Sequence, residues 1–319
     1  MSKFIPTIGI EVHVEIKSKS KLFSSSANTY GMATNTAVNV IDLGYPGTLP
    51  TVNKEIVRQG IRTAHILNCD ITRRMHFDRK NYFYPDNPKN YQITQNRTPI
   101  GRNGYVEIEV DGVKKKIEIE ELHIEEDTCK SAHRGSVSLL DFNRAGVPLI
   151  EIVTKPCISN SKEAMAYLTK LKELLFYANI SDCKMEEGSM RCDANVSISK
   201  DEKLGTRTET KNISSIHNVG LAIEKEIERQ EEVLRSGGKI YEETRRFDDK
   251  LGETILMRVK ETGNDYRYFI EPDIPYLELT DEFINESLST LPLLPDELRE
   301  KYSKVGLSSL QIEKLINNR

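Results

Sequence analysis

Residues 7–16 read TIGIEVHVEI, an alternation of apolar residues with polar or small ones. A period of two is typical of a β-strand with one face in a hydrophobic core, because successive side chains point to opposite faces of a sheet. The isoleucines and valines would lie on the buried face, and Glu11, His13 and Glu15 would share the other. The segment therefore predicts a strand whose polar face is available for chemistry.

The Glu-x-His-x-Glu pattern recurs at residues 121–125 as ELHIE, followed directly by Glu126 and Asp127. The apolar parity shifts between Ile119 and Leu122, which predicts a β-bulge of the kind often found beside active sites. Any amphipathic strand has a polar outer face, so one such pattern is weak evidence for a site. Two copies make a stronger case.

Residues 189–198 form a third alternating segment, with Arg191, Asp193 and Asn195 on one face and Glu186 and Glu187 just before it. Strands with Glu, His, Asp and Arg opposite an apolar face predict a floor of hard oxygen ligands. Such ligands favour Mg²⁺ held partly by substrate phosphates, whereas several Cys or His ligands would favour zinc.

Basic side chains could neutralise the charge on a transferring phosphoryl group, which is most of what a protein contributes to that chemistry. The candidates are spread along the chain: Arg79, Lys80, Arg144, Arg191, Arg245, Arg246, Arg258, Lys260 and Arg267. The sequence has no GxGxxG, GxxxxGK[ST], HExxH or GxSxG segment, so Rossmann, P-loop, zincin and nucleophile-elbow interpretations lose their main support. The residues alone predict a Mg²⁺-dependent site, suited to ATP, on an antiparallel sheet.

Strand patterns come in groups with helices between them, which predicts an α+β fold with a mostly antiparallel sheet. Helices are expected at about residues 53–67, from residue 161, and at about 215–236. Strands are expected at residues 189–198, 206–211, 255–260 and 266–269, with a hairpin at 105–121 and an irregular connection at 24–50. Beyond residue 292 the pattern changes to short charged helices.

Composition limits the class of protein. The 319 residues, of which 38% are hydrophobic and 29% charged, describe one large or two fused globular domains. No apolar run approaches the roughly 20 residues of a membrane span. The five cysteines form no CxxC pair and no signal-peptide core is visible, so a reducing cytoplasm is expected.

The net charge of −4 argues against a general nucleic-acid binder, but residues 71–104 carry seven basic residues against two acidic ones. Aromatic residues are interleaved with them: Phe77, Tyr82, Phe83, Tyr84 and Tyr91. Cations for phosphates and rings for exposed bases suit a nucleic-acid end. The alternative is a surface loop rich in Pro and Asn whose tyrosines pack on their own domain.

Long blocks of the sequence resemble one known family. They are IGIEVHVEIKSKSKLFSS, NVIDLGYPGTLPTVN, FDRKNYFYPDNPKNYQITQ, LHIEEDTCKS, DFNRAGVPLIEIV, KMEEGSMRCDANVS, QEEVLRSGG, ETRRFD and MRVKETGNDYRYFIEPDIP. In this order, from about residue 8 to 301, they are similar to the B subunit of glutamine-dependent aspartyl/glutamyl-tRNA amidotransferases.

The resemblance implies a cradle-shaped catalytic domain similar to glutamine synthetase over residues 1–292. Residues 293–319 would begin a helical domain, whose remainder and following tail domain are absent here.

The resemblance also implies a carbon–nitrogen ligase that uses ATP to phosphorylate the side-chain carboxylate of Glu on tRNA(Gln) or Asp on tRNA(Asn). Ammonia then displaces the phosphate. It would come through a tunnel from glutamine hydrolysed by an amidase A subunit, and a small C subunit would tie the two larger subunits together. The unbroken catalytic part favours a bacterial, cytoplasmic member.

The resemblance also assigns candidate residues. Metal candidates are Glu11, His13, Glu125 and Glu126, with Glu15, Glu186 and Glu187 behind them. Nucleotide or phosphate contacts are expected from Lys80, Arg191, Asp193, Arg245 and Arg246. The block 77–95 would face the tRNA acceptor end, through Arg79, Tyr82, Tyr84, Lys89 and Tyr91.

Two other functions fit parts of the sequence. A tRNA-binding scaffold whose chemistry occurs elsewhere would bind through residues 71–104 with a strong salt dependence and no nucleotide dependence. A stand-alone carboxylate–amine ligase would act on free glutamate without tRNA.

Overall fold

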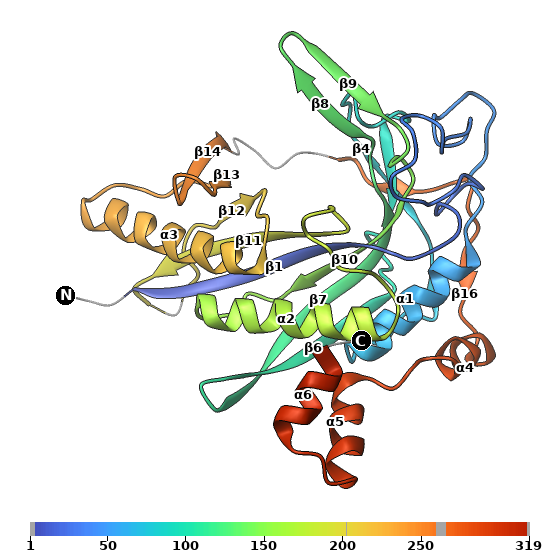
Figure 1. The fold of residues 1–319 in the computed structure, drawn as a ribbon. Coiled ribbons are helices and arrows are strands. Elements are labelled where there is room, and N and C mark those ends of the chain that lie inside the picture. Colours follow the sequence, from blue (N-terminus) through green and yellow to red (C-terminus); the bar gives the residue numbers. More distant parts are fainter. Residues whose placement is uncertain (1–3, 202, 260–265, 318–319) are drawn as a thin grey trace.

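The computed structural model describes residues 4–201, 203–259 and 266–317, and a nine-stranded sheet forms its centre (Figure 1). The strand order is β14-β13-β12-β11-β1-β10-β7-β6-β2. In chain order these strands are β1 (Ile5–Glu15), β2 (Asp70–Ile71), β6 (Gly101–Val110), β7 (Val113–Glu126), β10 (Pro148–Thr154), β11 (Met190–Ser199), β12 (Thr208–Lys211), β13 (Glu243–Asp248) and β14 (Glu253–Val259).

Neighbouring strands of this sheet pair antiparallel, except that β12 and β13 are parallel. The parallel pair needs a crossover connection, which helix α3 (Ile216–Arg235) supplies. The predicted α+β fold with a mostly antiparallel sheet is therefore confirmed.

Three long helices pack with the strands in one hydrophobic core: α1 (Lys54–Ile66), α2 (Ser161–Tyr177) and α3. Each begins where the sequence predicts, because a side-chain oxygen caps its first turn. Asn53, Asn160 and Ser215 accept hydrogen bonds from the backbone N–H groups of Glu55, Glu163 and Asn218. The apolar faces of the strands are thereby covered, and their polar faces are left for the site.

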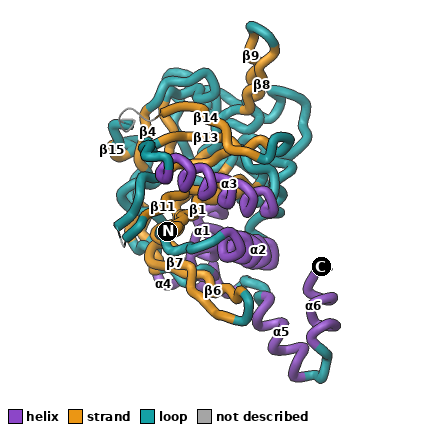
Figure 2. Tube along the Cα trace, turned by 90° about the vertical axis from the view of Figure 1, so that its left-hand side faces the viewer, coloured by secondary structure: helices purple, strands orange, loops and turns teal. Residues whose placement is uncertain are grey.

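Smaller units surround the sheet. Strands β15 (Phe269–Ile270), β4 (Asp78–Asn81) and β5 (Tyr91–Thr94) form one sheet, and β3 (Arg74–Met75) pairs with β16 (Leu277–Glu278). The hairpin of β8 (Lys130–Arg134) and β9 (Val137–Asp141) projects from the body in both views (Figures 1 and 2). Helices α4 (Asp281–Ser289), α5 (Pro295–Lys304) and α6 (Ser309–Asn317) complete the described chain.

Most local predictions are confirmed. The bulge in β7 lies where the parity shifts, because Val153 pairs with Glu121 while Thr154 pairs with Ile119. The strand expected at 266–269 is shorter, since Arg267 has φ 44° and strand pairing begins only at Phe269. Helix α4 was not expected from the sequence pattern. None of the described helices combines the length and hydropathy that a membrane span requires.

Candidate active site on the polar face of the sheet

Strand register aligns ionisable side chains in a row across four strands. His13 on β1 is paired with Arg191 on β11 at one side and with Glu151 on β10 at the other. Glu151 is in turn paired with His123 on β7. Cross-strand partners lie on the same face at about 5 Å, so these four side chains share the polar face.

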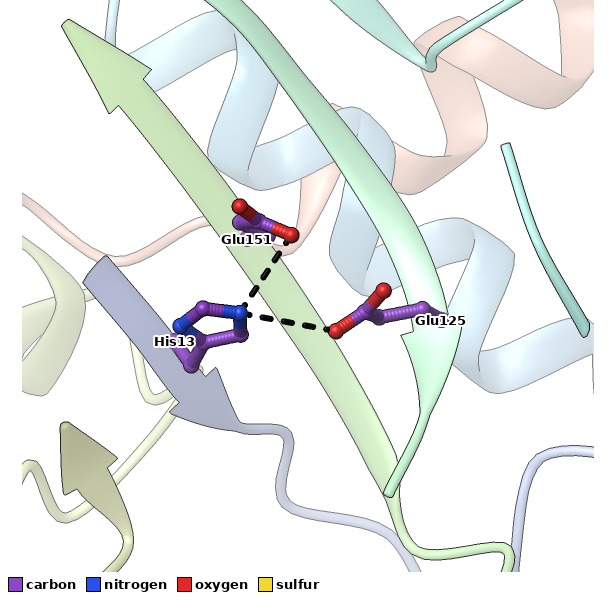
Figure 3. Close-up of side chains that lie close together, drawn as sticks. All are labelled: His13, Glu125 and Glu151. Atoms are coloured by element: carbon purple, nitrogen blue, oxygen red, sulfur yellow. Dashed lines mark ion pairs between the residues drawn. The ribbon is translucent and has the colours of Figure 1, made fainter. Parts of the chain in front are cut away.

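His13, Glu125 and Glu151, which we call the histidine group, converge from β1, β7 and β10 (Figure 3). His13 Nε2 lies 3.3 Å from Glu151 Oε2 and 3.6 Å from Glu125 Oε1. A second imidazole adjoins them, because His123 Nε2 lies 3.0 Å from the same Glu151 oxygen and 3.6 Å from Glu125 Oε2. Two carboxylates and two imidazoles thus share one small volume.

Attraction between the imidazoles and the carboxylates sets the protonation state of the histidine group. Burial lowers the pKa of His13, but Glu151 and Glu125 more than compensate and raise it to about 9. The pKa of His123 is raised to about 10 in the same way. Burial raises the pKa values of Glu125 and Glu151, yet the histidines hold both below the ordinary value. Without a metal ion, protons on the imidazoles balance the carboxylates.

A second cluster, which we call the carboxylate group, consists of Glu11, Asp193 and Glu209 from β1, β11 and β12. Lys211 Nζ lies 2.6 Å from Asp193 and 3.0 Å from Glu209. Asn195 donates a 2.8 Å hydrogen bond to Glu11. Burial, then Glu151 and Glu209, raise the pKa of Glu11. This group lies beside the histidine group, because Glu11 and His13 are two residues apart on one strand.

Both groups fit a divalent cation by their donor chemistry. In each, one ligand atom from every residue lies within 4.8 Å of the others. Carboxylate oxygens with at most one imidazole suit Mg²⁺, which keeps several waters and takes few protein ligands. The predicted metal residues Glu11 and His13 therefore fall in two neighbouring groups, and Glu125 joins His13 in the histidine group.

Glu15 lies further along β1 among charged neighbours. Burial and Asp127 raise the pKa of Glu15 to about 7, against the opposing effect of Arg191 and Arg144. Arg191 Nη2 lies 2.6 Å from Asp127, and Arg144 Nε lies 3.5 Å from the same carboxylate oxygen. This end of the polar face carries two guanidinium groups around one buried carboxylate.

Lys80, on β4, lies close to the histidine group. Burial lowers the pKa of Lys80, but Glu125, Tyr268 and Glu151 raise it above its ordinary value. The neighbouring strand β5 also contacts the group, since Thr94 Oγ1 donates a 3.1 Å hydrogen bond to Glu125 Oε2. The small sheet thus closes one side of the site.

A hollow of about 260 Å³ lies beside the carboxylate group. Gly9, Glu11, Asn195 and Ser197 line it on the sheet, and Leu204, Gly205 and Arg207 line it from the loop before β12. A Cβ at position 9 would meet nothing closer than 3.9 Å, so the absence of a side chain there leaves the floor open. The volume is slightly below the roughly 300 to 1,000 Å³ of ordinary ligand pockets, so the hollow could hold only part of a larger ligand.

Four predicted metal residues lie outside both groups: Glu15, described above, and three that are off the polar face. Glu126 follows Glu125 directly and therefore points to the opposite face, where Oε1 pairs with Lys89 Nζ at 2.5 Å. Glu186 and Glu187 lie in the turn before β11, and Glu187 pairs with Lys184 at 2.8 Å. The structure does not bring these carboxylates to either group.

The predicted phosphate contacts are also divided. Arg191 and Asp193 lie on the polar face, as described. Arg246 is exposed and is paired in register with Lys211. Arg245 points to the other face, where it pairs with Glu243 at 2.6 Å and with Glu226 of α3 at 3.4 Å. Lys260 lies outside the described residues.

The predicted acceptor-end residues are mostly engaged within the protein. Arg79 makes a bidentate contact with Glu271 and lies 4.1 Å above the Tyr91 ring. Lys89 is paired with Glu126, and Tyr82 is half-buried. Tyr84 is 56% exposed and the neighbouring Phe83 is 75% exposed. These two rings of the block are therefore accessible for stacking on a base.

Two members of these groups, Glu151 and Glu209, were not predicted from the sequence. Glu151 stands in the apolar run PLIEIV, where a lone carboxylate in a buried strand was the available signal. Glu209 lies in the short segment TETK, which carries no comparable signal. Both join their groups only through pairing with strands distant in sequence.

Comparison with known proteins assigns the family. A family profile described as the GatB/GatE catalytic domain matches residues 6–285, and the chain belongs to this family. The resemblance predicted from sequence is confirmed.

Curated relatives agree. The chain is 55% identical over 305 residues to the B subunit of the aspartyl/glutamyl-tRNA(Asn/Gln) amidotransferase of Ligilactobacillus salivarius, covering 94% of this chain and 64% of that protein. The proteins of the same name from Geobacillus kaustophilus (55% over 302 residues, 94% and 63%) and Bacillus velezensis (56% over 308 residues, 95% and 65%) match similarly. The chain therefore spans slightly less than two thirds of the length of these relatives.

Proposed function

We propose that this chain carries the ATP-dependent phosphorylation and amidation site of an aspartyl/glutamyl-tRNA(Asn/Gln) amidotransferase. The substrates would be Glu-tRNA(Gln) and Asp-tRNA(Asn), and the products Gln-tRNA(Gln) and Asn-tRNA(Asn). The observation that carries the proposal is the pair of cation-sized groups side by side on one polar face. Two such groups suit the β- and γ-phosphates of ATP and the substrate carboxylate that attacks the γ-phosphorus.

The reaction needs two displacements. A carboxylate oxygen of the aminoacyl side chain attacks the γ-phosphorus, and ADP leaves. Ammonia then attacks the acyl carbon, the C–O bond to phosphate breaks, and the amide forms after loss of a proton. Phosphate is a good leaving group where hydroxide is not, which is why ATP is consumed.

In this proposal the histidine group and the carboxylate group would each hold Mg²⁺, which neutralises phosphate charge when bound. His13 would then ligate as the neutral imidazole, while Glu125 and Glu151 contribute oxygens. Lys80 and Arg191, both beside the histidine group, would orient the transferring phosphoryl group and the attacking carboxylate. The hollow beside Glu11 would take the nucleoside part of ATP.

Several finer features belong to the same proposal. Residues 1–292 would form a cradle similar to glutamine synthetase, and residues 293–319 the start of a helical domain. The chain would work in the cytoplasm in a heterotrimer with an amidase A subunit and a small C subunit. Ammonia would come from the A subunit through a tunnel. Tyr84 is the predicted acceptor-end side chain best exposed to meet the tRNA.

Thermal unfolding with and without Mg-ATP tests the proposal, using Glu125→Gln and, as a matched control, Glu126→Gln. A ligand at 100 times its dissociation constant stabilises the folded state by about 2.7 kcal/mol. We expect this shift in the unaltered chain and in Glu126→Gln, whose carboxylate lies on the opposite face, but not in Glu125→Gln. A shift that survives in Glu125→Gln would refute the assignment of the site.

A tRNA-binding scaffold is the second candidate, favoured by the exposed rings of Phe83 and Tyr84. It predicts tRNA binding that weakens steeply with salt and is unchanged by Glu11→Gln. Tyr84→Ala would weaken that binding. If Mg-ATP also fails to stabilise the chain, the scaffold becomes the better description.

A further inference from the structure

Glu226, in the middle of α3, is a fully buried carboxylate beneath the edge of the large sheet. It accepts a 2.7 Å hydrogen bond from Thr208 Oγ1 on β12 and one of 2.9 Å from Thr254 Oγ1 on β14. Its other contacts include two cations: Arg229 of the same helix donates through Nε and Nη2, and Arg245 of β13 lies at 3.4 Å. One carboxylate therefore connects three adjacent strands.

The other face of the same strands carries part of the site. Glu209 on β12 is paired in parallel register with Thr244 on β13, and Thr244 Oγ1 donates a 3.1 Å hydrogen bond to Glu209 Oε2. The second oxygen of Glu209 faces Lys211 Nζ at 3.0 Å. The position of Glu209 in the carboxylate group therefore depends on two alignments: its antiparallel pairing with Asn195 on β11 and its parallel pairing with Thr244 on β13.

That alignment has little local support. In the described part of the large sheet, β12 and β13 form the one parallel pair. Helix α3 connects these two strands, so no tight turn fixes their register. The pair also lies near the sheet edge, where only β14 follows. If β12 slipped by one residue against both of its neighbours, every side chain of β12 would turn to the opposite face and Glu209 would leave its group.

We propose that Glu226 is a positioning residue that locks the register of β12, β13 and β14 and so places Glu209 and Lys211 in the site. The inference rests on the proposed function, because it gives these two side chains a role in binding Mg-ATP. Glu226 acts through the sheet and contacts no substrate. A buried carboxylate suits the role, since it must find several donors at fixed positions, whereas an apolar side chain tolerates many packings.

The matched variants change Thr208, a buried residue of β12 whose hydroxyl donates the hydrogen bond to Glu226. Thr208→Val keeps the shape but loses the hydroxyl, and Thr208→Ser restores it. Glu226→Gln is the stronger variant, because it removes the charge that faces both arginines. The control is Glu173→Gln on α2, whose carboxylate pairs with Arg299 far from β12.

Two measurements test whether Glu226 holds the strand register: Mg-ATP affinity by calorimetry, and amide hydrogen exchange of residues 206–211. We expect Thr208→Val and Glu226→Gln to weaken Mg-ATP binding about tenfold, at the low end of the loss seen for supporting residues of metal sites. Exchange of residues 206–211 should rise about tenfold while that of β1 stays unchanged. Thr208→Ser should behave as the unaltered chain, and Glu173→Gln should change the melting temperature alone.

Unchanged affinity and exchange in Thr208→Val and Glu226→Gln would overturn the proposal. So would an equal loss of affinity in Glu173→Gln, because the effect would then be general destabilisation. If the unaltered chain does not bind Mg-ATP, the proposed function fails, and hydrogen exchange alone decides whether Glu226 holds the register.

Discussion

The histidine group and the carboxylate group each take one residue from strand β1 but balance their negative charge differently. Imidazoles face Glu125 and Glu151, whereas the Lys211 ammonium faces Asp193 and Glu209. Burial lowers the pKa of Lys211, but Asp193 and Glu209 raise it above its ordinary value, so this cation is permanent. The histidine group can exchange protons for a metal ion. The carboxylate group must share its oxygens between an ion and a fixed lysine.

The largest expected difference between the groups comes from removing one carboxylate in each. Glu151→Gln should weaken Mg-ATP binding about a hundredfold and Glu209→Gln about tenfold, which are the two ends of the loss seen when partners of metal ligands are removed. Glu151 contacts both histidines, with Glu125 beside them, so its loss disturbs the whole histidine group. When Glu209 is neutralised, Lys211 still supplies positive charge for the phosphates. Calorimetry at one pH would show this order, and the reverse order would contradict the comparison.

The pH dependence of metal affinity should separate the groups further. The proton on His13 must leave before Nε2 can bind a cation, and its pKa is about 9. In Glu209→Gln, Mn²⁺ affinity should therefore rise about tenfold per pH unit from neutral pH and level off above pH 9. In Glu151→Gln, where the carboxylate group remains intact, affinity should be flat over that interval. A flat profile in both would show that His13 is not a ligand.

Without a bound metal, the thermal stability of the fold should depend on the proton carried by the His123 imidazole. The folded pKa of His123 is about 10, above the ordinary value of 6.5, so the protonated imidazole stabilises the fold. This contribution is complete below pH 6.5 and is lost as pH rises through 10. His123→Gln should lower the melting temperature by about 3 °C or more at pH 6. The gap should close near pH 10, and a gap independent of pH would point to lost packing instead.

The smallest expected effect concerns Arg246, which extends the positive charge of Lys211 toward the sheet edge. Arg246→Gln should weaken Mg-ATP binding about threefold at low salt and not at high salt, because an exposed charge is screened. Arg134→Gln on the projecting hairpin serves as the control and should change nothing. Equal effects of both variants would show that only net charge matters.

Local features of the fold were predictable from the sequence. Period-two alternation placed β1, β7 and β11, and polar caps placed the starts of α1 and α3, because these signals depend on neighbouring residues. The parity shift before Leu122 predicted the bulge that the register confirms. The β15 strand was misjudged in length because a positive φ at Arg267 leaves no mark in an alternating pattern.

The candidate site was predictable only in part. The patterns around His13 and Glu125 identified some of the ligands, and His123 stood inside one of them. Glu126 was grouped with Glu125 although neighbours on a strand face opposite ways. Arg245 and Arg246 illustrate the same point, since one is buried against α3 and the other is exposed.

The sequence by itself determined which segments become strands and helices, and which strand faces are polar, because side-chain periodicity and capping are local properties. Only the tertiary structure decided which polar faces meet. The histidine group joins residues 13, 125 and 151, and the carboxylate group joins residues 11, 193 and 209. Strand order and register bring them together, and these depend on the packing of the whole sheet against α1, α2 and α3.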